Sequence, residues 1–96
     1  TGIGFMDKQP LKGRRKLEKI VRRRSSIVHV ICGHIHRPVQ AEWAATSASA
    51  APSVAFQMAL GLEIKASSAI TTEPPACAVF LWSAKDGFIG HHISIG

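Results

Sequence analysis

Hydrophobic positions in the first third of the chain follow the period of a helix. Between Pro10 and Arg24, three apolar residues, Leu17, Ile20 and Val21, fall on one arc of a helical wheel, and basic residues fall on the opposite arc. Proline suits an early helical position, because its missing N–H has no partner there. The pattern predicts an amphipathic helix over about residues 10–24.

The middle of the chain has the patterns of strands. Ile27–Ile31 is β-branched and apolar apart from one histidine, which is typical of a buried strand. Ala41–Ala51 consists mostly of small residues and predicts either a closely packed strand or a poor helix. In Val54–Ile64 the large apolar residues recur at every second position, which predicts a half-buried strand.

The end of the chain predicts a hairpin. Cys77–Trp82 is an apolar run of strand length, and Phe88–Ile95 alternates between apolar and other residues. Asp86-Gly87 between them is a hairpin turn signal. We therefore expect an α/β protein, or α+β for this chain taken alone, with one N-terminal helix and a mostly antiparallel set of strands.

Length and composition narrow the class of protein. The 96 residues suffice for one small domain, and 46% hydrophobic against 19% charged residues excludes a disordered tail. Two cysteines exclude a disulfide-stapled mini-protein, and without a signal peptide they favour reduced thiols in the cytoplasm. No apolar run is long enough to span a membrane. The chain starts at Thr1 and not at Met, so we expect a processed chain or a piece of a longer one.

The positive charge belongs to one segment. The formal net charge is +6, and most of the Lys and Arg residues lie between Lys8 and Arg24. This segment is either a basic nucleic-acid-binding module or the solvated face of an ordinary surface helix. No aromatic residue interleaves with the basic ones, so a nucleic-acid partner is not expected.

Two histidines follow the strand expected over residues 27–31. His34 and His36 lie two apart just past its end, after Gly33, which would let the backbone turn sharply. Loops at the carboxyl ends of strands are where open α/β sheets place ligands, and imidazoles suit Zn, Fe or Mn. Two histidines are an incomplete set, so spacing alone leaves a metal site and a structural pair both open.

Other polar and aromatic residues have two interpretations each. Arg37 contacts a phosphate, or it is a surface residue held extended by the proline after it. His29 lies within its strand and is expected to face the core or a neighbouring strand. Gln57 is assigned no role. The aromatic residues are either a base-stacking platform or core and interface packing: Trp43, Phe80, Trp82 and Phe88.

Gly-His-x-His directly after a β-branched strand resembles the last metal-binding motif of the calcineurin-like metallophosphoesterases. The similarity covers nearly the whole chain and is greatest to the bacterial class III cyclic nucleotide phosphodiesterases. The segments that carry it are Thr1-Gly2-Ile3-Gly4-Phe5-Met6-Asp7, Cys32-Gly33-His34-Ile35-His36, Ala51-Pro52-Ser53 with Phe56-Gln57, and Glu73-Pro74-Pro75-Ala76. The fold that this resemblance implies is a four-layer αββα sandwich, of which residues 1–96 would be the carboxyl-terminal part: a helix over about 10–24, a metal-motif strand and loop over 27–38, and a β region over 41–95.

The resemblance also implies a chemistry. His34 would bind one ion and His36 the other of a binuclear centre of Mn, Fe or Zn, in a hydrolase for phosphodiesters such as 3′,5′-cyclic nucleotides. The carboxyl-terminal β region of that family takes part in homodimers, so a homo-oligomer is expected, and a purely structural or dimerisation element is the alternative.

The sequence also lacks several motifs of the family that it resembles. The family's other ligand motifs, Asp-x-His, Gly-Asp and Gly-Asn-His, are missing: Asp7 and Asp86 are the two aspartates, and the chain has no asparagine. The catalytic set is therefore incomplete. We expect a carboxyl-terminal fragment that holds metal weakly or not at all and is inactive by itself.

Overall fold

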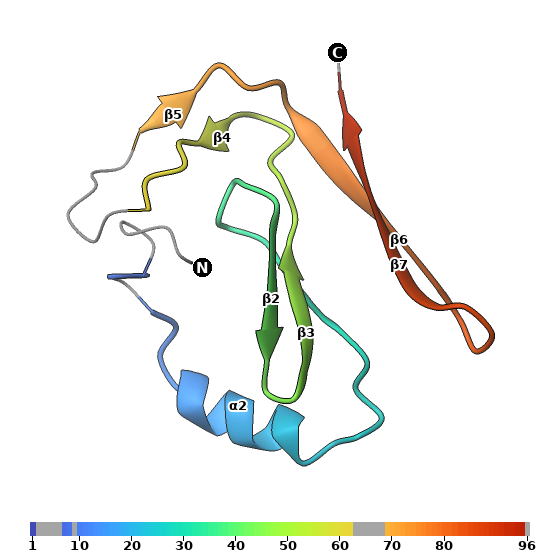
Figure 1. Ribbon diagram of the computed structural model, residues 1–96. Coiled ribbons are helices and arrows are strands. Elements are labelled where there is room, and N and C mark those ends of the chain that lie inside the picture. Colours follow the sequence, from blue (N-terminus) through green and yellow to red (C-terminus); the bar gives the residue numbers. More distant parts are fainter. Residues whose placement is uncertain (2–6, 9, 63–68, 96) are drawn as a thin grey trace.

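The computed structural model describes residues 1, 7–8, 10–62 and 69–95 (Figure 1). Its elements are α2 (Arg14–Arg22), β1 (Val30–Cys32), β2 (Val39–Trp43), β3 (Thr46–Ala50), β4 (Gln57–Met58), β5 (Ile70–Thr71), β6 (Ala76–Ser83) and β7 (Gly87–Ser94). One strand pair, β1 with β3, is parallel and the other pairs are antiparallel. This arrangement confirms the predicted α+β class. In the described part of the chain, no helix is both long and apolar enough to cross a membrane.

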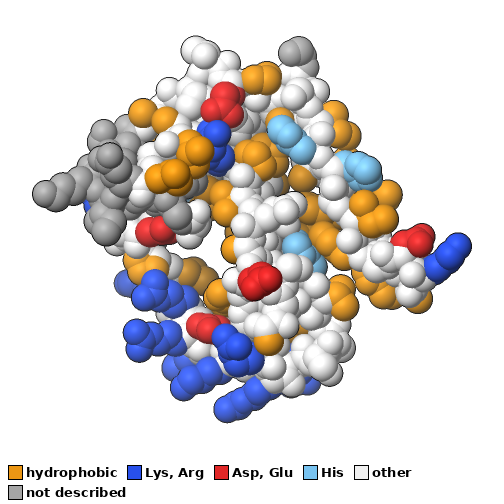
Figure 2. All heavy atoms as spheres, in the orientation of Figure 1, with side chains coloured by type: hydrophobic (Ala, Val, Ile, Leu, Met, Phe, Trp, Pro, Cys, Tyr) orange, Lys and Arg blue, Asp and Glu red, His pale blue; other side chains and the backbone are white. Residues whose placement is uncertain are grey.

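The helix forms as predicted but starts four residues later. Gly13 precedes it with a φ of 76°, a left-handed conformation that glycine adopts without strain, and helical geometry begins at Arg14. On the predicted apolar face Val21 is 7% exposed, whereas Ile20 is 55% exposed. The basic side chains gather at the end of the molecule where α2 lies (Figure 2), and Arg22 pairs with Glu18 at 2.8 Å. The positive charge is thus on an exposed face.

β1, β3 and β2 form a three-stranded sheet in that order. The segment over residues 41–51, expected as one strand or a poor helix, contributes to two strands joined by a tight turn. Its central residues, Ala44 and Ala45, have φ values of 52° and 62°. Two left-handed residues in succession are the geometry of a type I′ hairpin turn, which favours Asn and Gly. Sequence alone missed the turn because Ala-Ala carries no such signal.

This turn predicts a stabilising substitution. Ala45 is exposed, and the left-handed region costs an alanine about 1–2 kcal/mol. Ala45→Gly should raise the free energy of unfolding by about 0.5–1 kcal/mol, after allowance for the larger entropy of glycine in the unfolded chain. Ala41→Gly, at an exposed strand position of β2, is the matched control and should lower it by about 0.5–1 kcal/mol in the same urea titration. Equal effects of the two substitutions would contradict the assigned turn.

The strand predicted for Val54–Ile64 is wrong over most of its length. Only Gln57–Met58 is a strand, paired with β5, and positions 63 and 64 lie outside the described residues. The hydroxyl of Ser53 accepts hydrogen bonds from the backbone N–H groups of Ala55 (3.0 Å) and Phe56 (3.3 Å). This local turn bends the backbone where the period of two predicted an extended chain.

The strand predicted at residues 27–31 is shorter and less covered than expected. β1 spans Val30–Cys32, and Val28 and Ile31 are exposed, so its prediction as a buried strand is wrong. β1 is exposed because it lies at the edge of the sheet. Within the described part of the chain it pairs with β3 alone.

The carboxyl-terminal hairpin is confirmed. β6 and β7 pair antiparallel from Ala76↔Ser94 to Ser83↔Gly87, and Gly87 has a φ of 75°. The hydroxyl of Ser83 accepts a hydrogen bond from the N–H of Asp86 at 2.9 Å, which closes the turn. The hairpin runs beside the three-stranded sheet in Figure 1.

Candidate functional site

The loop between β1 and β2 carries both candidate metal ligands. His34 and His36 have φ values of 73° and 55°, whereas Gly33 is not left-handed. The sharp turn predicted at Gly33 therefore occurs at the two histidines. Left-handed residues other than glycine are uncommon and often found at functional sites, because the strain persists only where surrounding contacts enforce it.

The two imidazoles have different surroundings. His34 is exposed, and His36 is half-buried with its ring centroid 4.7 Å from that of Phe56. The Nδ1 atom of His36 is buried and has no hydrogen-bond partner among the described residues. A buried polar atom without a partner costs about 1–3 kcal/mol, so this nitrogen has an unmet bonding requirement.

A cluster of hydrogen bonds ties this loop to β4 and to the segment after β5. The carbonyl of His36 accepts a hydrogen bond from the N–H of Met58 at 2.8 Å. Nη1 of Arg37 donates to the carbonyl of Met58 and to Oε1 of Glu73, each at 2.8 Å. The Arg37 side chain is 16% exposed and that of Glu73 47%. Arg37 is therefore largely covered, and its predicted contact with phosphate stays a prediction.

The arginine also affects the charge state of its partner. The hydrogen bond from Arg37 lowers the pKa of Glu73 below its ordinary value. The shift favours the carboxylate form of Glu73, and its contact with Arg37 is an ion pair. Pairs of this kind form shorter and stronger hydrogen bonds than neutral groups do.

Sequence reasoning missed Gln57, which holds the two segments beside this loop together. It is 2% exposed. Its Nε2 donates to the carbonyls of Ser53 (2.7 Å) and Pro74 (3.3 Å), and its Oε1 accepts from the N–H of Ser53 at 3.1 Å. In the sequence, Gln57 stands out as a polar residue within an apolar run. On the strand that was expected there, its side chain would have faced solvent, so no role was assigned to it.

His34 and His36 are suitable metal ligands in chemical type, but two ligands are fewer than a metal site needs. Imidazole is a suitable ligand for Zn, Fe and Mn, and His34 and His36 share one short loop. Within residues 1, 7–8, 10–62 and 69–95, no group of three or more His, Cys, Asp or Glu side chains gathers closely enough to hold a metal ion. Metal-bound histidines also donate their second ring N–H to an acceptor, and Nδ1 of His36 has none in this part of the chain.

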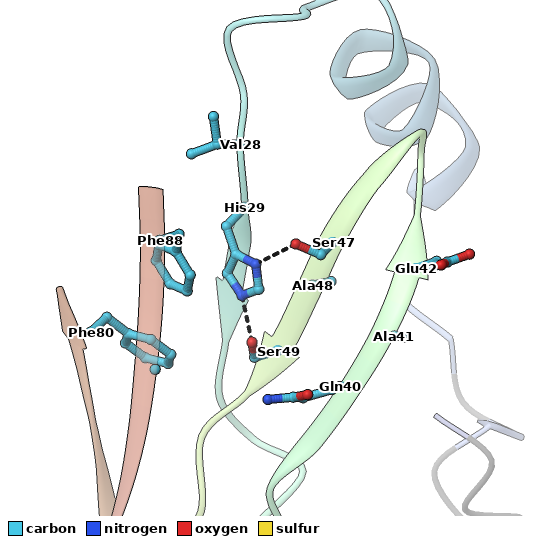
Figure 3. A pocket seen from close by; sticks show the side chains of 11 residues that line it. Val28, His29, Gln40, Ala41, Glu42, Ser47, Ala48, Ser49, Phe80 and Phe88 are labelled. Carbon is cyan, nitrogen blue, oxygen red and sulfur yellow. Dashed lines mark hydrogen bonds between the residues drawn. The ribbon is translucent and has the colours of Figure 1, made fainter. Parts of the chain in front are cut away.

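A second group of polar residues surrounds His29, which faces the neighbouring strand β3 as expected but precedes β1 and does not lie within it. Its Nδ1 hydrogen-bonds the hydroxyl of Ser47 at 2.7 Å, its Nε2 bonds that of Ser49, and its ring stacks on Phe88 at 4.0 Å (Figure 3). These residues line a groove of about 630 Å³ between β3 and the carboxyl-terminal hairpin. Burial lowers the pKa of His29 below its ordinary value, which favours the neutral imidazole.

The aromatic residues considered for base stacking fall into two groups. Phe80 and Phe88 stack on each other at 5.2 Å and thus pack within the molecule, whereas Trp82 is exposed. Whether any of them contacts a nucleotide stays a prediction.

Nearly the whole chain is similar to part of a longer protein. No protein-family model matches the chain. The chain is similar to the probable glycerophosphodiester phosphodiesterase GpdQ of Arcobacter nitrofigilis, with 31% identity over 96 residues. The similar region is 99% of this chain and 35% of the relative, so the chain spans about a third of that protein's length.

Proposed function

We propose that this chain contributes the Gly-His-x-His segment of a metal-dependent enzyme that hydrolyses phosphodiesters. The observation that carries the proposal is the pair of imidazoles, His34 and His36, on one strained loop at the carboxyl end of β1. The similarity to a relative described as a phosphodiesterase supports the reaction class.

His34 and His36 would each hold one divalent ion, of Mn, Fe or Zn. Ions bound there would supply Lewis acidity toward phosphoryl oxygens and acidify a water molecule. The histidines would contribute directional nitrogen ligands. Arg37 has both hydrogens of Nη1 engaged by Met58 and Glu73, so a phosphate oxygen would meet its remaining guanidinium N–H groups.

The substrate is proposed as a phosphodiester, with two candidate classes. The relative's name specifies glycerophosphodiesters, and the family resemblance of the motifs favours 3′,5′-cyclic nucleotides. The homo-oligomer implied by that resemblance also stays a proposal. Large apolar side chains exposed on β6 and β7, such as Leu81, Trp82 and Ile93, support it.

Metal titration of the 96-residue chain tests the site. We expect weak, millimolar binding, because two imidazoles are fewer than the three protein ligands of a catalytic zinc site. Substoichiometric Mn²⁺ should broaden the NMR signals of residues 33–37 first. We also expect no turnover of bis(p-nitrophenyl) phosphate above buffer. Broadening centred on His91 and His92 would place the metal elsewhere, and measurable turnover would refute the predicted inactivity of the chain.

A further inference from the structure

We propose that Arg37 and Glu73 are positioning residues for the loop that carries His34 and His36. They would hold both imidazoles where a metal ion can reach them. This inference rests on the proposed function, since it assigns the two residues a task at the same site. The Arg37 clamp, as we name it, comprises Arg37, Met58 and Glu73.

The loop needs such a restraint because its backbone is strained. His34 and His36 are left-handed at φ values of 73° and 55°. That conformation costs roughly 1–2 kcal/mol for each residue that is not glycine. Two such residues within three positions persist only if contacts outside the loop favour this conformation.

The clamp supplies those contacts through both backbone polar groups of Met58. The N–H of Met58 donates to the carbonyl of His36, and the carbonyl of Met58 accepts from Nη1 of Arg37, each at 2.8 Å. Consecutive residues of the loop thus hold the two polar groups of a single residue in β4. Breaking either bond leaves a polar group of Met58 without that partner.

Glu73 fixes the arginine in this geometry. Its Oε1 accepts from the same Nη1 at 2.8 Å, so a carboxylate faces the guanidinium. The Arg37 side chain is largely covered, so loss of Glu73 would leave its positive charge without this partner. The clamp therefore joins the metal-ligand loop to a residue 36 positions further along the chain.

The test compares three variants of the 96-residue chain with the wild type. Arg37→Met removes the clamp, and Glu73→Gln keeps an acceptor but removes its charge. Arg22→Met is the matched control, because it removes an arginine whose ion pair with Glu18 has the same 2.8 Å length and lies on α2. Amide hydrogen exchange of Met58 reports the loop anchor, and Zn²⁺ titration reports the presentation of the histidines.

Arg37→Met should speed exchange of the Met58 amide and weaken Zn²⁺ binding, each by about 10-fold, which is the size expected for loss of a hydrogen bond that involves a charged group. Glu73→Gln should shift both in the same direction by a smaller factor, and it remains informative if Arg37→Met fails to fold. Arg22→Met should change neither. Unchanged Met58 exchange, or faster exchange with unchanged Zn²⁺ affinity, overturns the proposal. If the wild type binds no Zn²⁺ at His34 and His36, the proposed function fails, and Met58 exchange alone then decides whether the clamp anchors the loop.

Discussion

Replacing His36 by glycine should reduce Zn²⁺ and Mn²⁺ affinity by at least about 10-fold, to that of a lone histidine. The physical reason is ligand count, since one of two imidazoles is lost and even outer-shell partners are worth about 10–100-fold. Glycine is the informative replacement because it accepts the φ of 55° without strain. The backbone turn is then preserved while the ligand is removed, and calorimetric titration measures the change.

Two further variants test whether the loss of affinity is specific to the loop of His34 and His36. His34→Gly should give a similar loss, because the proposed site uses both residues of the loop. His92→Ala is the control, since it removes an exposed imidazole from β7 and leaves the loop intact. A His36→Gly chain that binds metal as tightly as the wild type would show that the ion is held elsewhere.

The elements that sequence predicted correctly are those with strong local signals. The carboxyl-terminal hairpin follows from two strand patterns around Asp86-Gly87, and Gly87 takes the left-handed conformation that the turn requires. The helix follows from its apolar arc, although Gly13 delays its start. Both depend on interactions within a few residues, so a single sequence is enough to predict them.

The elements that sequence missed depend on weak or competing signals. Ala44-Ala45 forms a hairpin turn without the usual turn residues, because pairing between β2 and β3 outweighs the local cost. The alternation over Val54–Ile64 did not produce a strand of that length, because the hydroxyl of Ser53 holds a turn at its start. An alternating pattern predicts which side chains share a face only if the backbone is extended. It does not reveal a hydrogen bond from a side chain that bends the backbone instead.

In the candidate site, too, sequence indicates the features with a local signal and misses the long-range contacts. His34 and His36 were recognised because they are two apart after a strand, and their roles as ligands stay predictions. The pairing of Arg37 with Glu73 joins residues 36 positions apart, and nothing in the local sequence of either indicates the other. Such long-range contacts are fixed by tertiary structure and are therefore the part that a single sequence does not supply.

Replacing Gln57 by leucine should lower the free energy of unfolding by about 1–3 kcal/mol. Leucine has a similar size but cannot hydrogen-bond. It leaves the N–H of half-buried Ser53 and the carbonyl of exposed Pro74 without the partner that Gln57 provides, and such a loss costs most where water cannot replace the partner. The carbonyl of Ser53 keeps its hydrogen bond from the N–H of Ala76 at 2.8 Å, so it adds little. Urea unfolding followed by circular dichroism measures the difference.

The matched control is Gln40→Leu, at an exposed position of β2, which should change stability by less than about 0.5 kcal/mol. The comparison separates burial from amino-acid type, since both variants lose the same amide. Gln57 also adjoins Met58, so weaker anchoring of β4 should speed exchange of the Met58 amide as well. A Gln57→Leu chain as stable as Gln40→Leu would show that the Ser53 and Pro74 segments are held together by the β4–β5 pairing and the Ala76 to Ser53 bond alone. In that case the support of the loop that carries His34 and His36 would come from Arg37 and Glu73 without help from this glutamine.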